Sequence, residues 1–379
     1  MMRLTGLAPL VLCLACGSSP GGADTGGSSG GAGSSGGGET GGSTQGPAPT
    51  GSSTAEPTST GGSISGDAST GTGLVTSGPA GTSSSGEPDP GSGTGSSGGD
   101  TTTAAPACAG KLAAGDHTIE LTHDGIKRTA LVHVPASANL DEPTPLVFNF
   151  HGYLNTAELQ QTFSGMTPKS DEAGFIVVYP NGTETSWNAG VCCGNAAVKK
   201  IDDVGFVRAL VAELQVQLCI DPRRIYATGM SNGGFMTHRL ACEAADLFAA
   251  FAPVSAVNGM TDCTPSRPVP LLMFNGTADL LVLYNGGGNG GTFISAPKTF
   301  DDWAKRDGCV GAAVPGKTSG KSSCKTHDLC DADVSVTLCT MDNMGHCWPG
   351  QPSCIYGTPN TDLSANDEMW EFFKNNPLP

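Results

Sequence analysis

The first 147 residues contain no aromatic side chain, since the first Phe, Tyr or Trp is Phe148. Residues 17–105 also lack lysine and arginine, and they hold 28 of the 56 glycines among many serines and threonines. A segment without large apolar side chains cannot bury enough surface to offset the entropy lost on folding. We therefore expect a disordered tether over residues 17–106. A repeat domain is the competing interpretation, but the Gly-Ser units offer no apolar side chains to stack.

Positive charge is scarce. The chain has 19 Lys and Arg against 35 Asp and Glu, a net charge of −16, and residues 107–379 carry 18 against 28, or −10. Such a surface repels phosphate, so we expect no nucleic acid partner. The glycines follow no strict Gly-X-Y period, which excludes collagen. Residues 107–379 hold all 22 aromatic side chains, which is enough for one large core.

The amino terminus has the features of an export signal. Arg3 precedes an apolar run over residues 4–14, which is too short to span a bilayer, and small residues follow. Residues 14–17, Leu-Ala-Cys-Gly, resemble a bacterial lipoprotein processing site in which Cys16 becomes the lipidated first residue. We expect a signal peptide over residues 1–16 and an extracellular or cell-surface protein, anchored to the outer membrane through Cys16. Ordinary cleavage and release is the alternative, and the oligomeric state stays open.

The cysteines predict disulfides. Fourteen are present, and an even twelve remain if Cys13 leaves with the signal and Cys16 carries lipid. Proximity favours two pairs, Cys242 with Cys263 and Cys347 with Cys354. The adjacent Cys192 and Cys193 are expected to bond to different partners.

Strand and helix signals alternate in residues 107–379, the expected folded domain. An opening hairpin is predicted over residues 117–135, and short apolar runs predict buried strands at 146–150, 175–179, 224–228, 249–254, 270–275 and 334–338. Helical periodicity is found at 203–218, 235–245 and 365–374. The fold class is therefore α/β, a mainly parallel sheet with helices on both faces. Asp202 and Asp203 open the first helix, as capping residues or, alternatively, in catalysis.

A nucleophile elbow is predicted at residues 229–233, Gly-Met-Ser-Asn-Gly. The Gly-x-Ser-x-Gly pattern also occurs in the tether, at residues 27–31 and 95–99, so the pattern alone has no weight. Only the site at Ser231 follows an apolar strand and precedes a helix. A sharp turn there exposes the hydroxyl to a base, and the glycines permit close packing. The helix start directs the Asn232 amide toward a developing oxyanion.

The other parts of a serine hydrolase follow in the order that this fold uses. The Tyr153 amide, in the loop after residues 146–150, is the candidate for a second oxyanion donor, although a plain glycine turn with Tyr153 packed at the rim is the alternative. Asp279 follows the strand at 270–275, and His346 follows the last strand. The chain order Ser, Asp, His predicts a catalytic triad, although an Asp in a turn is common.

Two further patterns favour other chemistry but lack the context for it. Residues 311–318 match a phosphate-binding loop, yet no buried strand precedes them and no helix follows. Cys324, His327 and Cys330 have a zinc-like spacing, but export favours a disulfide between the two cysteines. We therefore expect no metal and no cofactor.

These motifs together resemble the secreted serine esterases grouped with poly(3-hydroxybutyrate) depolymerases and feruloyl esterases, which have an α/β-hydrolase fold. The resemblance covers residues 118–373. Its most specific pieces are Phe-His-Gly-Tyr at 150–153, Cys-Cys-Gly at 192–194, Asp-Asp-Val-Gly-Phe at 202–206, Tyr-Ala-Thr-Gly-Met-Ser-Asn-Gly-Gly at 226–234 and Gly-His-Cys-Trp-Pro-Gly at 345–350.

The resemblance implies Ser231 as nucleophile, His346 as base and Asp279 as its orienting acid, with the amides of Tyr153 and Asn232 around the oxyanion. It also implies a substrate-side aromatic at Trp348, and Trp187 is a further candidate to flank an acyl group, although packing is the alternative for Trp348. The expected function is depolymerase-like hydrolysis of carboxylic esters. The alternatives are a feruloyl or acetyl esterase on plant polysaccharide, and a surface lipoprotein that only binds its partner.

Overall fold

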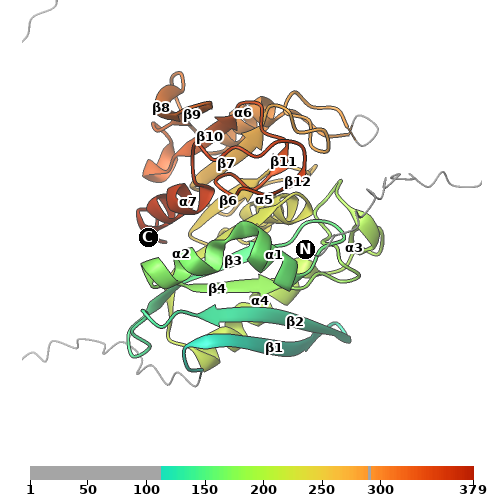
Figure 1. Cartoon of the computed structure of the whole chain (residues 1–379), viewed down its shortest axis with the longest axis vertical. Helices are drawn as coiled ribbons and strands as arrows, with labels where there is room; N and C mark the ends of the chain where they lie inside the picture. The colour runs from blue at the N-terminus through green and yellow to red at the C-terminus, as the bar shows by residue number, and fades with distance from the viewer. Residues whose placement is uncertain (1–111, 289–291) are drawn as a thin grey trace, which may run out of the picture. The chain divides into compact units, whose positions relative to one another are not determined.

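The structure is a computed structural model that describes residues 112–288 and 292–379, so the expected signal peptide, Cys16 and the whole expected tether lie outside the described residues. Ten of the described strands form one sheet in the order β1-β2-β4-β3-β5-β6-β7-β10-β9-β8 (Figure 1). Along the chain these strands are β1 Gly115–His123, β2 Ile126–Val134, β3 Thr144–Phe150, β4 Ile176–Pro180, β5 Ile220–Met230, β6 Ala250–Val254, β7 Leu271–Gly276, β8 Val314–Ser319, β9 Ser322–His327 and β10 Val336–Met341.

The centre of the sheet is parallel. Strands β4, β3, β5, β6, β7 and β10 run in the same direction, and antiparallel hairpins extend both edges. Every residue of β3, β4, β6 and β7 is buried, as expected for strands covered on both faces. The predicted fold class, a mainly parallel sheet of the α/β-hydrolase kind, is confirmed.

Helices cover both faces of the sheet (Figure 1). Helices α1, α2 and α7 pack on one face, and α4, α5 and α6 pack on the other. The helices are α1 Ala157–Ser164, α2 Met166–Ala173, α3 Gly194–Val198, α4 Asp203–Gln217, α5 Asn232–Glu243, α6 Ala296–Arg306 and α7 Ala365–Lys374. The predicted helices correspond to α4, α5 and α7. No described helix is long and apolar enough to cross a membrane.

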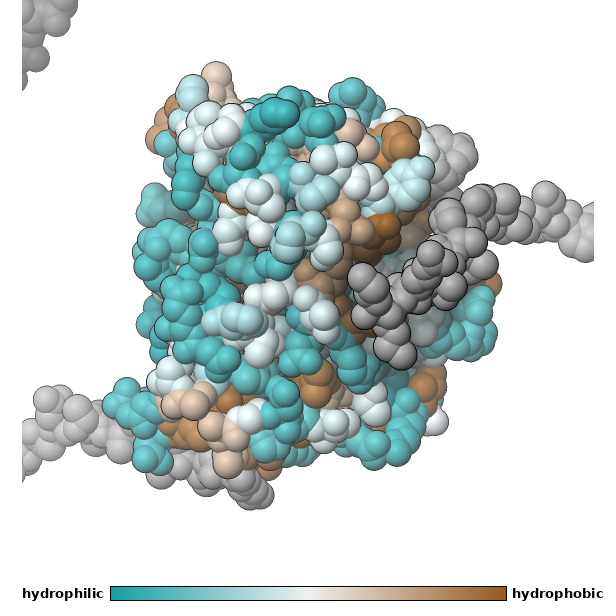
Figure 2. Space-filling view, in the orientation of Figure 1, coloured by the Kyte–Doolittle hydropathy of each residue, from teal (hydrophilic) through white to brown (hydrophobic). Residues whose placement is uncertain are grey.

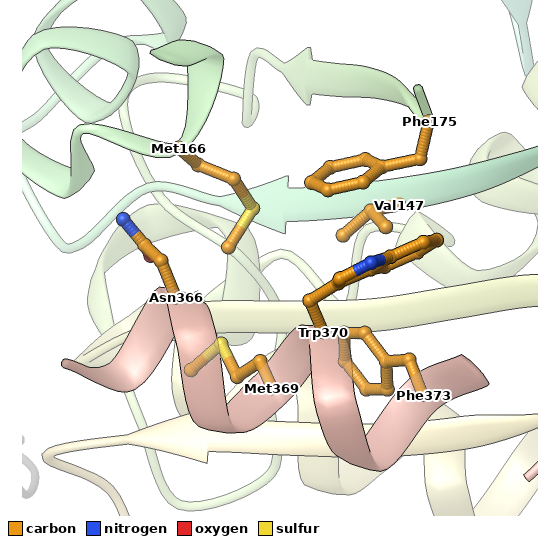
Figure 3. Close-up of a pocket in the computed structure, with 7 residues that line it drawn as sticks. All are labelled: Val147, Met166, Phe175, Asn366, Met369, Trp370 and Phe373. Carbon is orange, nitrogen blue, oxygen red and sulfur yellow. The ribbon is translucent and has the colours of Figure 1, made fainter. Parts of the chain in front are cut away.

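Helix α7 is held to the sheet by apolar side chains. Its Met369, Trp370 and Phe373 point toward Val147 and Phe175 on the strand side (Figure 3). The rings of Trp370 and Phe175 stack with their centroids 4.6 Å apart. This contact packs α7 against the sheet and covers that face of the core.

Five disulfides join described residues, and two of them are the predicted pairs Cys242–Cys263 and Cys347–Cys354. Two expectations are wrong. Cys192 and Cys193 bond to each other rather than to different partners, and Cys324 and Cys330 do not form a pair. The register of β9 against β10 places Cys324 opposite Cys339, its partner, and Cys330 bonds to Cys309.

The phosphate-loop pattern and the zinc-like pattern both overlap the β8–β9 hairpin at one edge of the sheet. Residues 314–319 form the exposed outer strand β8, which leads into β9 rather than into a helix, so they make no phosphate loop. The two cysteines of the zinc-like pattern, Cys324 and Cys330, belong to different disulfides. The His327 ring stacks on Phe300, with the ring centroids 4.8 Å apart.

Candidate active site

Ser231 lies on a sharp turn between β5 and α5. Its backbone has φ 54° and ψ −124°, a sparsely populated conformation that persists only when neighbouring structure enforces it. The Ser231 amide donates to Val254 O at 3.0 Å, and its carbonyl accepts the first helical hydrogen bond, from the Phe235 amide at 2.9 Å. Both sides of the turn are therefore fixed, as a nucleophile elbow requires.

Two glycines allow this turn to pack against β3. A Cβ on Gly229 would lie 2.7 Å from Phe150 O, and a Cβ on Gly233 would collide with the same carbonyl. Gly152 faces Ser231, because a Cβ there would lie 3.4 Å from Ser231 Cβ. The loop after β3 thus approaches Ser231 at van der Waals distance.

Asp279 and His346 form a buried pair. His346 Nδ1 lies 2.7 Å from Asp279 Oδ2, and each side chain is 1% exposed. The other carboxylate oxygen, Oδ1, accepts from the amides of Leu281 and Val282 at 2.8 and 2.9 Å. These bonds fix the carboxylate, and the carboxylate in turn fixes the imidazole ring.

His346 lies in a short hairpin outside the main sheet. β11 (His346–Cys347) pairs with β12 (Cys354–Tyr356), and the Cys347–Cys354 disulfide joins the two strands. The segment just before His346 packs on the end of β7, where a Cβ on Gly276 would collide with Met344 O. A glycine at this strand end therefore allows the segments that carry Asp279 and His346 to meet.

The histidine hairpin is also tied to the elbow. Val254 accepts the Ser231 amide, and the next residue, Ser255, donates its hydroxyl to Cys347 O at 3.2 Å. Two hydrogen bonds through the end of β6 therefore connect Ser231 with the residue after His346. The structure thus brings Ser231, Asp279 and His346 to one edge of the sheet.

The two expected oxyanion donors flank Ser231. The Asn232 amide is the first of helix α5, where no preceding turn supplies an acceptor. The Tyr153 amide follows Gly152, and no hydrogen bond from it to any described residue is formed. Both N–H groups are thus available to an oxygen that develops negative charge beside Ser231.

The tryptophans differ from the expectation. Trp187 and Trp348 are both 0% exposed, and their indole N–H groups donate to His151 O at 3.0 Å and to Asn366 Oδ1 at 2.9 Å. Rings buried and hydrogen-bonded in this way pack in the core, as the packing alternative for Trp348 expects. The burial of the two tryptophans depends on tertiary packing. It cannot be predicted from the fact that they lie near the motifs in the sequence.

Asp202 and Asp203 have separate structural roles. Asp202 caps α4 by accepting the Gly205 amide at 2.9 Å, and this bond, with that from His123, holds the pKa of Asp202 below its usual value. Asp203 is buried and binds Arg128 at 2.8 Å. Burial raises the pKa of Asp203, although Arg128 acts in the opposite direction. The capping interpretation holds for Asp202, whereas Asp203 forms an ion pair in which both side chains are buried.

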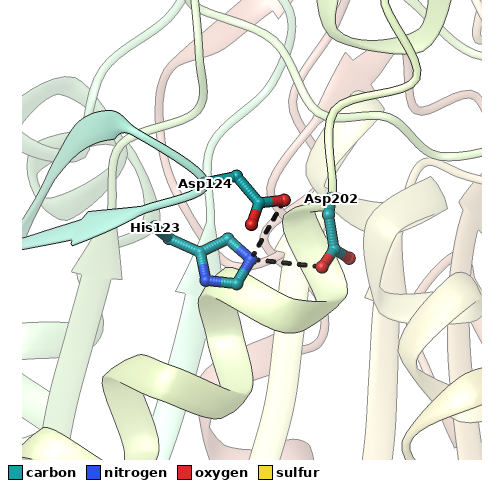
Figure 4. Close-up of side chains that lie close together, drawn as sticks. All are labelled: His123, Asp124 and Asp202. Atoms are coloured by element: carbon teal, nitrogen blue, oxygen red, sulfur yellow. Dashed lines mark hydrogen bonds and ion pairs between the residues drawn. The ribbon is translucent and has the colours of Figure 1, made fainter.

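One group of described side chains has the composition of a metal site. His123, Asp124 and Asp202 lie near one another where the β1–β2 hairpin meets the start of α4 (Figure 4). His123 Nε2 is 3.1 Å from Asp202 Oδ2 and 3.8 Å from Asp124 Oδ2. Hydrogen bonding and helix capping account for this arrangement, and the group contributes no atom to the Ser231 site.

Several known esterases are similar in sequence to this chain. The chain is 35% identical to "Feruloyl esterase B" of Piromyces equi over 58% of its own length, but it covers only 42% of the length of that protein. It is 30% identical to "Putative esterase NocK" of Nocardia uniformis subsp. tsuyamanensis, over 67% of this chain and 81% of that one. A model of the prolyl oligopeptidase family matches residues 161–267, the part that contains the elbow.

Solved structures with a similar chain path include an acetyl xylan esterase from Aspergillus awamori. It is 15% identical, with a TM-score of 0.47, and the match covers 68% of this chain and 99% of that one. An S-formylglutathione hydrolase from Agrobacterium tumefaciens is 16% identical, with a TM-score of 0.46, over 71% of this chain and 98% of that one.

Proposed function

The chain belongs to the serine esterases with an α/β-hydrolase fold, and from this membership we propose that it cleaves carboxylic esters through an acyl-enzyme on Ser231. The observation that carries the proposal is the buried Asp279–His346 pair, tied by hydrogen bonds to the elbow that bears Ser231. A serine hydroxyl becomes a useful nucleophile only beside a base that is oriented by a third group.

In the first half of the reaction, Ser231 Oγ attacks the ester carbonyl and its proton moves to His346 Nε2. That nitrogen is the acceptor because Nδ1 carries its hydrogen toward Asp279, 2.7 Å away. The carbonyl oxygen becomes an oxyanion, which accepts from the amides of Tyr153 and Asn232. The C–O bond to the alcohol then breaks, and the imidazolium gives its proton to the leaving oxygen.

The second half repeats these steps with water. His346 Nε2 takes a proton from water, the resulting hydroxide adds to the acyl carbonyl, and the same amides hold the second oxyanion. When the bond to Ser231 breaks, the imidazolium returns the proton to Oγ and the carboxylic acid leaves. Apart from the ester and water, every reacting group in these steps belongs to the described chain.

The proposal is tested with the full chain and a short-chain nitrophenyl ester. Ser231→Ala should lower kcat by about 10⁴-fold or more, because the covalent step has no replacement nucleophile. Ser323→Ala, an exposed serine in β9, is the matched control and should leave kcat unchanged. Equal rates for wild type and Ser231→Ala would remove the catalytic proposal and favour the binding lipoprotein.

For the substrate we propose an acyl ester on plant polysaccharide, with a hydroxycinnamoyl group such as ferulate as the first choice. Support comes from relatives named feruloyl esterase, one of which, from Emericella nidulans, is 26% identical over 65% of this chain and 83% of that one. The test compares kcat/KM for methyl ferulate and methyl acetate. A preference for the acetyl ester would favour an acetyl esterase instead.

A polyester oligomer is the second candidate, and apolar side chains beside the site favour it. Leu154, after Tyr153, is 50% exposed, Leu280, after Asp279, is 62% exposed, and Tyr356, opposite His346 in the hairpin, is 53% exposed. On the face in Figure 2, hydrophobic side chains gather in the region of this hairpin on a mostly hydrophilic surface. A higher kcat/KM for 3-hydroxybutyrate trimer than for methyl ferulate would select the depolymerase-like function.

We further propose that the protein acts outside the cell and is held there by lipid on Cys16. The disulfides between described residues support an oxidising compartment. Labelling of producing cells with radioactive palmitate tests the anchor. Label on the wild type but not on Cys16→Ser is the expected result, and equal absence of label from both would favour cleavage and release.

A further inference from the structure

The expected oxyanion donors belong to segments far apart in the sequence, and one buried residue contacts both segments. Trp187 lies in the loop between β4 and α3. Its amide donates to Asn232 Oδ1 at 2.7 Å, and its carbonyl accepts from Asn232 Nδ2 at 3.0 Å. Its indole N–H donates to His151 O at 3.0 Å. Trp187 is therefore bonded to the elbow on one side and to the loop after β3 on the other.

His151 continues this connection to the Tyr153 amide. The Gly182 amide donates to His151 Nε2 at 2.9 Å, so the ring hydrogen is on Nδ1, which donates to Gly152 O at 2.7 Å. Burial lowers the pKa of His151 to about 4, so the ring is neutral near pH 7. Gly152 C=O and Tyr153 N–H belong to one planar trans peptide group and point in opposite directions. A fixed carbonyl therefore fixes the direction of the Tyr153 amide.

The ring of Trp187 is also held by its neighbours. It meets Phe150 edge to face, with centroids 5.2 Å apart, and its centroid is 5.1 Å from that of His151. Trp187, His151 and Asn232 are all fully buried, so the hydrogen bonds that join Trp187 to the other two residues are shielded from water. Such bonds act as rigid connections, because breaking one leaves a buried polar group without a partner.

We propose that Trp187 is a positioning residue that fixes the spacing of the Tyr153 and Asn232 amides, so that both donate to one oxyanion. The inference rests on the proposed acyl-enzyme mechanism. Donors accelerate a reaction when they are already in place as charge develops, and a misplacement of about 1 Å can lower the rate by roughly 10²-fold. The residue selected from sequence as a substrate contact thus acts through the backbone of the site.

The test is Trp187→Phe in the full chain. Phenylalanine keeps an aromatic ring but cannot donate to His151 O, while the backbone bonds to Asn232 remain. We expect kcat to fall about tenfold and KM to change less than twofold, because the oxyanion forms only in the transition state. A role in stability alone would not produce this division between kcat and KM.

Trp303→Phe is the matched control. Trp303 is also 0% exposed, and its indole N–H donates to His238 Nδ1 at 3.1 Å, between α6 and the later turns of α5. The two variants each lose one buried indole hydrogen bond, so their thermal unfolding temperatures should fall by similar amounts. Only Trp187→Phe should lose kcat.

Phenylboronic acid gives a second measurement that does not depend on turnover. Its tetrahedral adduct on Ser231 places an oxygen where the oxyanion forms, so Trp187→Phe should raise its inhibition constant about tenfold and Trp303→Phe should leave it unchanged. If Trp187→Phe does not fold, Asn232→Ala keeps the backbone amide, removes both bonds to Trp187, and should give the same result.

Two results would overturn the inference: equal loss of kcat in the Trp187 and Trp303 variants, or unchanged kcat and boronate inhibition in Trp187→Phe. A wild-type protein whose esterase activity does not depend on Ser231 would instead remove the proposed function, and the inference with it. The wild type, Ser231→Ala and the tryptophan variants measured together separate these failures.

Discussion

The carboxylate of Asp279 holds the imidazole of His346 from one side, with Oδ2 lying 2.7 Å from Nδ1 while Oδ1 accepts two backbone amides. In the proposed mechanism, this arrangement keeps the hydrogen on Nδ1 and leaves Nε2 to accept the Ser231 proton. Asp279→Asn can present its amide N–H to Nδ1, which would place the ring hydrogen on the wrong nitrogen.

We therefore expect Asp279→Asn to lower kcat by about 10³–10⁴-fold with little change in KM. Steady-state hydrolysis of a nitrophenyl ester measures the effect. Asp342→Asn is the control, because Asp342 is exposed nearby and binds Thr277 Oγ1 at 2.9 Å. A loss smaller than tenfold for Asp279→Asn would contradict the orienting role.

Removal of one partner of the Arg128–Asp203 ion pair should destabilise the protein strongly. Their side chains are 2% and 0% exposed, and removal of one partner leaves a buried charge alone. Asp203→Asn should lower the free energy of unfolding by about 3–5 kcal/mol. Urea denaturation of the full chain gives this quantity.

A surface ion pair provides the comparison for that measurement. Arg208 and Asp246 are 38% and 57% exposed at a separation of 2.6 Å. Asp246→Asn should change the free energy of unfolding by less than about 1 kcal/mol. If Asp203→Asn and Asp246→Asn lowered the free energy of unfolding by similar amounts, the prediction for the buried Arg128–Asp203 pair would be wrong.

His133 should make stability depend on pH. Its Nδ1 lies 2.7 Å from Asp116 Oδ1 and its Nε2 lies 3.0 Å from Asp171 Oδ1, an arrangement that suits a doubly protonated ring. Burial alone would lower the pKa of His133, but the bonds to Asp171 and Asp116 outweigh it and raise the pKa above the ordinary value. The stabilisation is therefore complete below the unfolded-state pKa of about 6.5, and it is lost as the pH rises through the folded-state pKa.

The measurement is the urea midpoint of wild type and His133→Gln at several pH values. The wild type should exceed the variant by more at pH 5.5 than at pH 8.5. His117→Gln is the control, because the His117 ring bonds to Ala113 O at 2.8 Å rather than to a carboxylate. A difference that grows with pH would refute the proposed sign.

Gly233→Ala should damage the elbow. The new methyl group would collide with Phe150 O, which belongs to a buried strand that cannot move away easily. We expect a loss of about 3 kcal/mol in the free energy of unfolding and a lower kcat. Gly316→Ala in the exposed strand β8 meets its nearest atom at 3.3 Å and should change stability by less than about 0.5 kcal/mol.

Local sequence signals were enough for the parts of the molecule that depend on local geometry. The apolar runs located the buried strands, and the strand and helix on either side of Ser231 separated the elbow from the same pattern in the tether. The chain order of Asp279 and His346 followed from the fold, because parallel strands end at one edge of the sheet.

Long-range pairing could not be predicted from spacing. Cys324 bonds to Cys339 because β10 runs back antiparallel to β9 and places the two cysteines opposite each other, and neither β8 nor β9 has a strong strand signal. The burial of Trp187 depends on where the elbow and the loop after β3 meet. The role of His151, which follows β3 in the Phe-His-Gly-Tyr motif, depends on its hydrogen bonds with Gly152 and Gly182, which its position in the sequence does not reveal.

The elements of the site emerge from the ribosome in a fixed order. Ser231 and Asp279 come first, and His346 follows within residues 309–354, a region with three disulfides. A nascent chain that stops before Cys354 would contain the elbow. It would lack strand β12 and the disulfide that hold the His346 hairpin together. The hairpin that carries His346 is therefore complete only once Cys354 has been synthesised and has formed its bond to Cys347.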